Sequence, residues 1–134
     1  MKDTTITIIA KLAKRAGYTG TVTGVNAGEI VQSLAENHTE MLGRRLDALY
    51  RQGVKCYTGY NDAGDEAYNH YTGLADSVLT LLNIELDYSA GLYPIYGLTR
   101  GGKHFTEYSA FGAIRQHINF WHHWKAEEEE TKPA

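Results

Sequence analysis

Three side chains that could carry chemistry fall on the apolar faces of two predicted helices. A helical wheel places His38 and Arg45 in the aliphatic stripe of residues 27–52, and His117 in that of residues 106–124. A guanidinium in the interior must be paired and hydrogen-bonded. A structural network is the simpler interpretation. The alternative is a cavity in which His38, Arg45 and His117 converge on an anionic ligand, because Arg offers a bidentate fork and His can carry a proton.

The sequence also contains residues that could form a divalent-cation site. Six acidic or histidine side chains could contribute to it: Glu36, Glu40, Asp62, Asp65, Glu66 and His70. Glu36 and Glu40 are four residues apart, as are Glu66 and His70, so each pair can share a helix face. This spacing differs from the Glu-x-x-Glu and Glu-x-x-Asp motifs of all-α nucleotide pyrophosphatases. We therefore assign no metal ligand and keep a metal-dependent phosphohydrolase as the weakest alternative.

Other catalytic motifs are missing from the sequence. It has no phosphate loop, no dinucleotide-binding glycine motif and no Gly-x-Ser-x-Gly elbow. His117, His122 and His123 are spaced so that one metal cannot readily collect them from a single helix. Cys56 is the only cysteine, which excludes an internal disulfide, and nothing in the sequence activates its thiol. We predict no catalytic residue and no cofactor, so a non-enzyme is favoured.

Tyrosine is the unusual feature of the composition. Nine of the ten tyrosines lie between Tyr50 and Tyr108. Tyrosine offers a large, rigid contact area with a polar tip, and mixtures of Tyr, Gly and Asn recur in binding surfaces. Tyrosines in predicted loops are the best candidates for a surface that docks a partner, together with nearby carboxylates. The predicted partner-binding residues are Tyr57, Tyr60, Asp62, Asp65, Tyr93 and Tyr96.

The elements that must position these side chains are mainly helical. The apolar spacing of residues 5–16 predicts a helix, although its β-branched residues also allow a strand. Asn26 as N-cap and Gly53 as terminator predict one long helix over residues 27–52. A third helix is predicted at 65–87.

The last third of the chain is less regular. Pro94 and the Thr99–Gly102 stretch predict a small hairpin or an irregular loop within residues 92–104. Thr106 is expected to cap a final helix that reaches residue 124. We expect a single-domain helical bundle of about four helices over residues 1–125, with an acidic, disordered tail at 126–134.

Composition narrows the class of protein. The net charge is −3, with an excess of three cations in residues 1–60 and of six acidic groups in the rest. A nucleic-acid binder normally has a stronger basic footprint, so nucleic acid is an unlikely partner. No apolar run approaches the roughly 20 residues needed to cross a bilayer, and no secretory signal is recognised, so we expect a cytoplasmic protein with no membrane partner.

The combined observations favour a small intracellular binding or regulatory protein that acts through protein–protein interaction. The absence of catalytic motifs motivates this hypothesis, and inhibitors or accessory proteins of mobile elements often have this character. The alternative is a small all-α enzyme or ligand sensor that uses His38, Arg45 and His117. The sequence does not indicate an oligomeric state.

Overall fold

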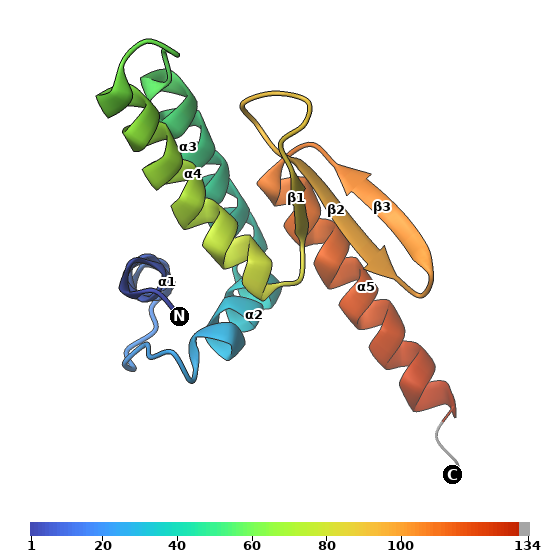
Figure 1. The fold of residues 1–134 in the computed structure, drawn as a ribbon. Helices are drawn as coiled ribbons and strands as arrows, with labels where there is room; N and C mark the ends of the chain where they lie inside the picture. Colours follow the sequence, from blue (N-terminus) through green and yellow to red (C-terminus); the bar gives the residue numbers. More distant parts are fainter. Residues whose placement is uncertain (132–134) are drawn as a thin grey trace.

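The computed structural model describes the backbone of residues 1–131 and the side chains of residues 1–120 (Figure 1). This part of the chain forms five helices and one antiparallel sheet of three strands, so the mainly helical class is confirmed but the helix count was one too low. The elements are α1 (Asp3–Arg15), α2 (Ala27–Asn37), α3 (Thr39–Cys56), α4 (Asp62–Leu81), β1 (Glu85–Asp87), β2 (Ile95–Arg100), β3 (Lys103–Glu107) and α5 (Ala110–Thr131).

The first segment is a helix, as its spacing predicted, and not a strand. Thr5, Ile9, Leu12 and Ala13 are buried along one face of α1. Intervals of three and four residues match one face of a helix. In a strand, which alternates its faces every residue, the same four residues would not all lie on one side. Burial of this face against α2 and α4 outweighs the β-branched preference of the first turn.

The predicted long helix over residues 27–52 is wrong, because the chain breaks at His38. His38 has φ −136° and ψ 43°, outside the helical region, and ends α2 just before α3 begins. The hydroxyl of Thr39 donates a 2.5 Å hydrogen bond to the carbonyl oxygen of Ala35. The buried stripe shifts at this break by about one residue step, roughly 100° around the helix axis. In α3 the stripe runs through Leu42, Gly43, Leu46, Tyr50 and Gly53.

Two glycines allow α3 and α4 to pack closely as an antiparallel hairpin. Gly53 does not end α3 as predicted but is buried within it, and a Cβ there would lie 3.2 Å from the Tyr68 carbonyl oxygen of α4. At Gly64, in the first turn of α4, a Cβ would collide with the carbonyl oxygen of Cys56. At both positions the close approach of the two helices therefore requires glycine, which has no side chain.

The predicted third helix stops earlier than expected. α4 ends at Leu81, and Asn83 adopts a left-handed conformation with φ 58°, which reverses the chain. Leu86, assigned to the helix by periodicity, lies instead in β1 and pairs with Tyr96 of β2.

Of the two alternatives for residues 92–104, a hairpin or an irregular loop, the hairpin is present. Arg100 of β2 pairs with Lys103 of β3 across a two-residue turn, Gly101 and Gly102, which have φ 56° and 77°. Two successive positive φ values are what a tight type I′ hairpin turn needs, and glycine adopts them without a steric cost. The sheet order is β1-β2-β3, and α5 packs against β2 and β3 (Figure 1).

Helix α5 starts at Ala110, not at Thr106, which lies in β3. The Ser109 hydroxyl accepts a 3.0 Å hydrogen bond from the Gly112 N–H group. The Asp47 carboxylate of α3 accepts two more, from Ala110 at 2.7 Å and from the next residue at 3.2 Å. The helix start is thus fixed by a partner 63 residues earlier, which no local sequence pattern could indicate.

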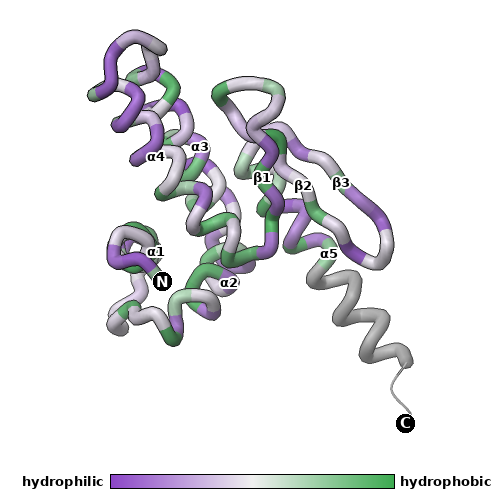
Figure 2. Tube along the Cα trace, viewed as in Figure 1, coloured by the Kyte–Doolittle hydropathy of each residue, from purple (hydrophilic) through white to green (hydrophobic). Residues whose placement is uncertain are grey.

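The core is formed by buried residues of all five helices and of β2, and hydrophobic residues concentrate around α2 and the adjoining end of α4 in Figure 2. The tip of the α3–α4 hairpin is hydrophilic in the same view. Among the residues that the structure describes, no helix is long and apolar enough to cross a membrane. The final helix runs to Thr131 and so extends past its predicted end at residue 124. The side chains of the tail predicted at 126–134 and the backbone of residues 132–134 lie outside the described residues, so the disorder of this tail stays a prediction.

Candidate functional site

The loop between α3 and α4 presents Tyr60 on a turn that side-chain hydrogen bonds hold. Tyr60 is 97% exposed. The Thr58 hydroxyl accepts hydrogen bonds from the N–H groups of Tyr60 and Asn61, at 3.2 and 3.0 Å. Asp65 accepts one from the Gly59 N–H, and the Asn61 side chain caps α4 by accepting one from Ala63. The loop is therefore held by side chains of its own segment, and its aromatic group is presented rather than buried.

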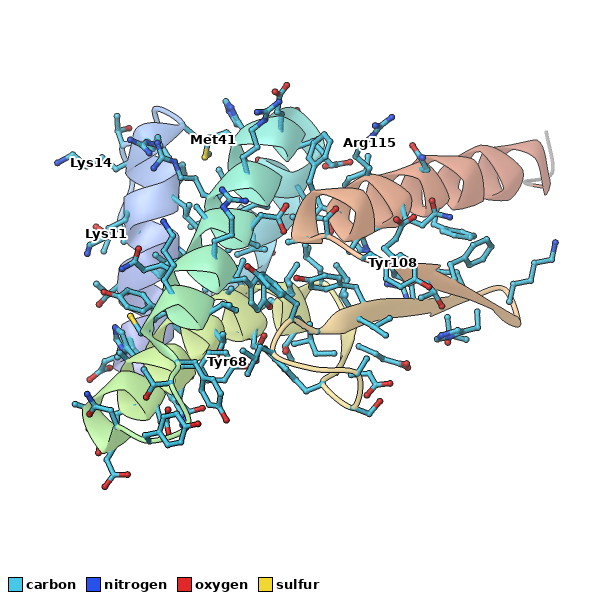
Figure 3. All side chains as sticks on the ribbon, turned by 90° about the horizontal axis from the view of Figure 1, so that it is seen from above. Lys11, Lys14, Met41, Tyr68, Tyr108 and Arg115 are labelled. Atoms are coloured by element: carbon cyan, nitrogen blue, oxygen red, sulfur yellow. The ribbon has the colours of Figure 1, made fainter. Side chains whose placement is uncertain are left out.

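A chain of contacts joins this loop to the segment before β2. The Tyr57 ring meets the Tyr68 ring edge-on, with centroids 5.3 Å apart. The Tyr68 hydroxyl then donates a 2.6 Å hydrogen bond to the carbonyl oxygen of Leu92. Figure 3 shows Tyr68 on α4, on the side of the hairpin that faces the β1–β2 connection. Tyr93, next to Leu92 in the chain, is 47% exposed.

The two segments predicted to bind a partner are thereby brought to one end of the molecule. We call the side chains of Tyr57, Tyr60, Asp62, Tyr68 and Tyr93 the tip surface. Asp62 is exposed, and Asp65 is half-buried because it supports the loop. Tyr96 was predicted with this group, but it is only 1% exposed and its ring lies edge-on against Tyr50, so its placement on a binding surface was wrong.

The second predicted group, His38, Arg45 and His117, is not assembled. His38 sits exposed at the α2–α3 break, and Arg45 is exposed on α3 beside α1. His117 alone is buried. The expectation that the first two face the core assumed an unbroken helix, and the shift of the stripe at His38 turns Arg45 outward. The proposed shared cavity for an anion is therefore contradicted.

His117 belongs to a different polar cluster, which joins three elements. Its Nε2 atom lies 2.8 Å from Oε1 of Gln32 on α2, and its Nδ1 atom lies 3.3 Å from Nη2 of Arg100 on β2. Arg100 can only donate, so Nδ1 must accept and Nε2 must carry the proton. Burial, and to a smaller extent the Arg100 charge, lowers the pKa of His117 to about 4. The imidazole is therefore neutral at pH 7.

The orientation of the Gln32 amide follows from the same cluster. Its Nε2 atom is buried without a hydrogen-bond partner. Exchanging the amide oxygen and nitrogen would make Nε2 of His117 an acceptor while Nδ1 already accepts from Arg100, which requires an imidazole without any proton. In this orientation the Gln32 oxygen accepts from His117, and the Gln32 NH2 group has no partner among the described side chains. The cluster occupies a packed junction and leaves no free ring nitrogen for a reaction.

A half-buried carboxylate and two phenols form a second polar cluster. Asp76 of α4 accepts hydrogen bonds from the hydroxyls of Tyr50, at 2.5 Å, and Tyr88, at 2.7 and 2.8 Å. Burial raises the pKa of Asp76, even though both hydrogen bonds act in the opposite direction. The pKa values of both tyrosines are also raised, first by burial and then by the nearby carboxylate. This cluster ties α3 and the end of β1 to α4.

The geometry does not support the divalent-cation site that the sequence left as an alternative. Within the described part of the chain, no three His, Cys, Asp or Glu side chains come close enough to hold a metal ion. Glu40 is instead paired with Arg44, at 2.7 Å on the exposed side of α3. Glu66 and His70 are exposed on α4.

Sequence reasoning missed the partners that organise these clusters. Asp47, Asp76, Gln32 and Arg100 each make contacts with residues distant in the chain. Asp76 and Gln32 had a detectable signal, since each is a polar residue close to the apolar stripe of its helix. Their partners, however, depend on how the helices and sheet pack.

Comparison of this chain with protein-family models, with curated proteins and with solved structures found no match.

Proposed function

We propose that the chain is a small binding or regulatory protein that docks a protein partner on the tip surface. The observation that carries this proposal is the contact chain Tyr57–Tyr68–Leu92, which brings together two loop segments more than 30 residues apart. Exposed aromatic side chains at one place are the usual anchors of protein interfaces.

The order of the tip loop supports docking. Binding costs conformational entropy when a loop must become ordered, and a loop already held by hydrogen bonds avoids most of that cost. The bonds to Thr58 and Asp65 hold the backbone on which Tyr60 stands. The tip surface is therefore prepared to bind before any partner arrives.

The charge around the tip surface suits a basic partner. Asp62, Asp65 and Glu66 lie in the first turn or so of α4, next to the aromatic groups. Complementary charges accelerate association and exclude partners of the wrong sign. We infer that the partner offers an apolar pocket for Tyr60 with Lys or Arg side chains at its rim.

Site-specific photocrosslinking tests the proposal and identifies the partner. A benzophenone amino acid replaces Tyr60 in one protein and Val25 in the control; both positions are almost fully exposed, at 97% and 96%. In cells that express the chain, we expect one crosslinked protein from position 60 and none from position 25. The same crosslinks from both positions, or none from position 60, would reject the tip surface as the interface.

Affinity measurements with the identified partner complete the test. We expect Tyr57→Ala with Tyr60→Ala to weaken binding by at least about tenfold, because both rings would be interface anchors. The matched control is Tyr18→Ala with Val25→Ala, whose exposed fractions of 43% and 96% resemble those of Tyr57 and Tyr60, at 40% and 97%. Equal affinities of the two double variants would exclude the tip surface.

A further inference from the structure

A groove with an apolar floor and a cationic rim lies between α1 and α3, on a part of the molecule that the proposed function does not use. Its volume is about 550 Å³. The apolar lining is Ile8, Leu12, Ala48 and Leu49, and the charged lining is Lys11, Lys14, Arg15 and Arg45. Figure 3 shows Lys11 and Lys14 on α1, the helix that forms one wall of the groove.

The groove cations have no carboxylate partners among the described side chains. Among the described side chains, Arg44 forms an ion pair with Glu40, but neither residue lines the groove. None of the described residues that line the groove is acidic. Four cations held close together without counter-charges favour an anionic occupant. The apolar floor would leave a phosphate backbone without hydrogen bonds, so an acidic helix with an apolar face fits better.

The same chain contains a segment with the complementary chemistry. The sequence places four consecutive glutamates, 127–130, shortly after its only two tryptophans, Trp121 and Trp124. Trp121, Trp124 and Glu128 follow one another at intervals of three and four residues, the spacing of one helical face. Ten helical residues span about 15 Å, and the stretch of α1 that lines the groove rises about 10 Å.

Because of the position of α5, we take the occupant of the groove to be this segment from a second copy of the chain. The described part of α5 packs on α3 and the sheet, whereas α1 lies on the other side of the α3–α4 hairpin (Figures 1 and 3). We propose that two copies of this chain associate by placing residues 121–130 of each copy in the α1–α3 groove of the other. Reciprocal exchange closes the pair with two identical contacts.

A charge-swap experiment tests this association with full-length chains. One variant reverses the groove, with Lys11→Glu and Arg45→Glu, and another reverses the segment, with Glu127→Lys and Glu128→Lys. Sedimentation velocity measures the mass of each at about 1–100 µM, a range suited to weak association. We expect the parent to dimerise and each variant alone to dimerise at least tenfold more weakly. An equimolar mixture of the two variants should recover the dimer, because both contacts are again between opposite charges.

Controls separate this contact from general electrostatics and from folding. Arg51→Glu with Lys55→Glu reverses two exposed cations of α3 outside the groove and should leave the dimer unchanged. Circular dichroism checks that each variant is folded; if the groove double variant is not, Lys14→Glu alone takes its place. Because Trp121 and Trp124 are the only tryptophans, their emission should shift to shorter wavelength as the parent dimerises.

Three results would overturn the proposal. The parent could remain monomeric at about 100 µM, a concentration at which a specific contact of this kind should form. The mixture of variants could remain monomeric while the parent dimerises, which would assign the dimer to another surface. A monomeric parent that binds a short DNA duplex, with binding lost in the groove variant, would assign the groove to nucleic acid.

Discussion

The Asp47 Oδ1 atom accepts a 2.7 Å hydrogen bond from the backbone N–H of Ala110, and its Oδ2 atom accepts one from Phe111 at 3.2 Å. The first N–H groups of a helix have no partner within the helix. The positive end of the helix dipole also lies at the N-terminus and favours a carboxylate there. Asp47 therefore fastens the start of α5 to the middle of α3.

Removing this carboxylate should cost stability. We expect Asp47→Ala to lower the free energy of unfolding by about 1–2 kcal/mol, the usual cost of losing a helix cap. Urea unfolding measures the loss. Glu40→Ala is the control, because it removes a carboxylate from the same helix that makes only a surface ion pair with Arg44, worth less than about 0.5 kcal/mol. Equal losses in the two variants would show that the cap contributes nothing.

Close packing of α3 against α5 depends on Gly43. A Cβ at this position would lie 2.6 Å from the Cα atom of Phe111, which is backbone and cannot rotate away. We expect Gly43→Ala to destabilise the fold by about 1–3 kcal/mol, although alanine is the better helix former. Gly73→Ala in α4 is the control, since its Cβ would meet nothing within 4 Å and should stabilise by about 0.5–1 kcal/mol. Thermal unfolding should move in opposite directions for the two variants.

The comparison of sequence and structure shows where periodicity stops being informative. It correctly identified α1, the positions of most helical segments and the Gly101–Gly102 hairpin, because apolar spacing and turn residues are local signals. It failed at His38, where the apolar spacing continues across the break and conceals it. That single break explains why Arg45 was expected inside and lies outside.

The polar sites were harder to predict than the fold. Tyr57 and Tyr60 were assigned to the surface because they lie in a loop, and this local argument holds for their exposure. Tyr96 was assigned in the same way but lies in a strand against Tyr50. Its burial is set by the packing of the sheet on the helices. The wheel alone could not identify Asp76 as an acceptor, because its donors come from α3 and from the residue after β1.

The two phenols around Asp76 should be energetically coupled. Removing either hydroxyl, by Tyr50→Phe or Tyr88→Phe, leaves the half-buried carboxylate with one donor, at a cost of about 1–2 kcal/mol for each variant. The double variant removes both donors, so its loss at pH 7 should exceed the sum of the single losses by at least about 0.5 kcal/mol. A double-mutant cycle by urea unfolding measures this coupling. Additive losses would mean that water replaces the first hydroxyl at no cost.

A matched phenol tests whether the effect belongs to this cluster. Tyr68→Phe also removes one part-buried hydrogen bond, to the Leu92 carbonyl oxygen, but that acceptor is not a carboxylate. The loss of unfolding free energy in Tyr68→Phe should therefore simply add to the loss in Tyr50→Phe. Coupling of the same size in both pairs would indicate a general loosening of α4.

The neutral state of His117 predicts a pH dependence of stability. Its pKa is lowered from 6.5 to about 4 in the folded chain, so the unfolded chain binds the proton more readily. The contribution to stability is complete above pH 6.5 and is lost as the pH falls towards 4. The full loss is about 3 kcal/mol. Asp76 acts in the opposite direction, because its raised pKa lets the folded chain take up a proton more readily as the pH falls.

Comparison with His117→Gln isolates the histidine contribution from that of Asp76 and other carboxylates. We expect the parent to lose more stability than this variant between pH 7.5 and 4.5, since glutamine has no proton to gain. His38→Gln, at an exposed histidine, should keep the slope of the parent. The ¹H NMR titration of the His117 ring gives its pKa directly. A midpoint near 6.5, or equal slopes in the parent and His117→Gln, would show that the Arg100–His117–Gln32 cluster does not hold the imidazole neutral.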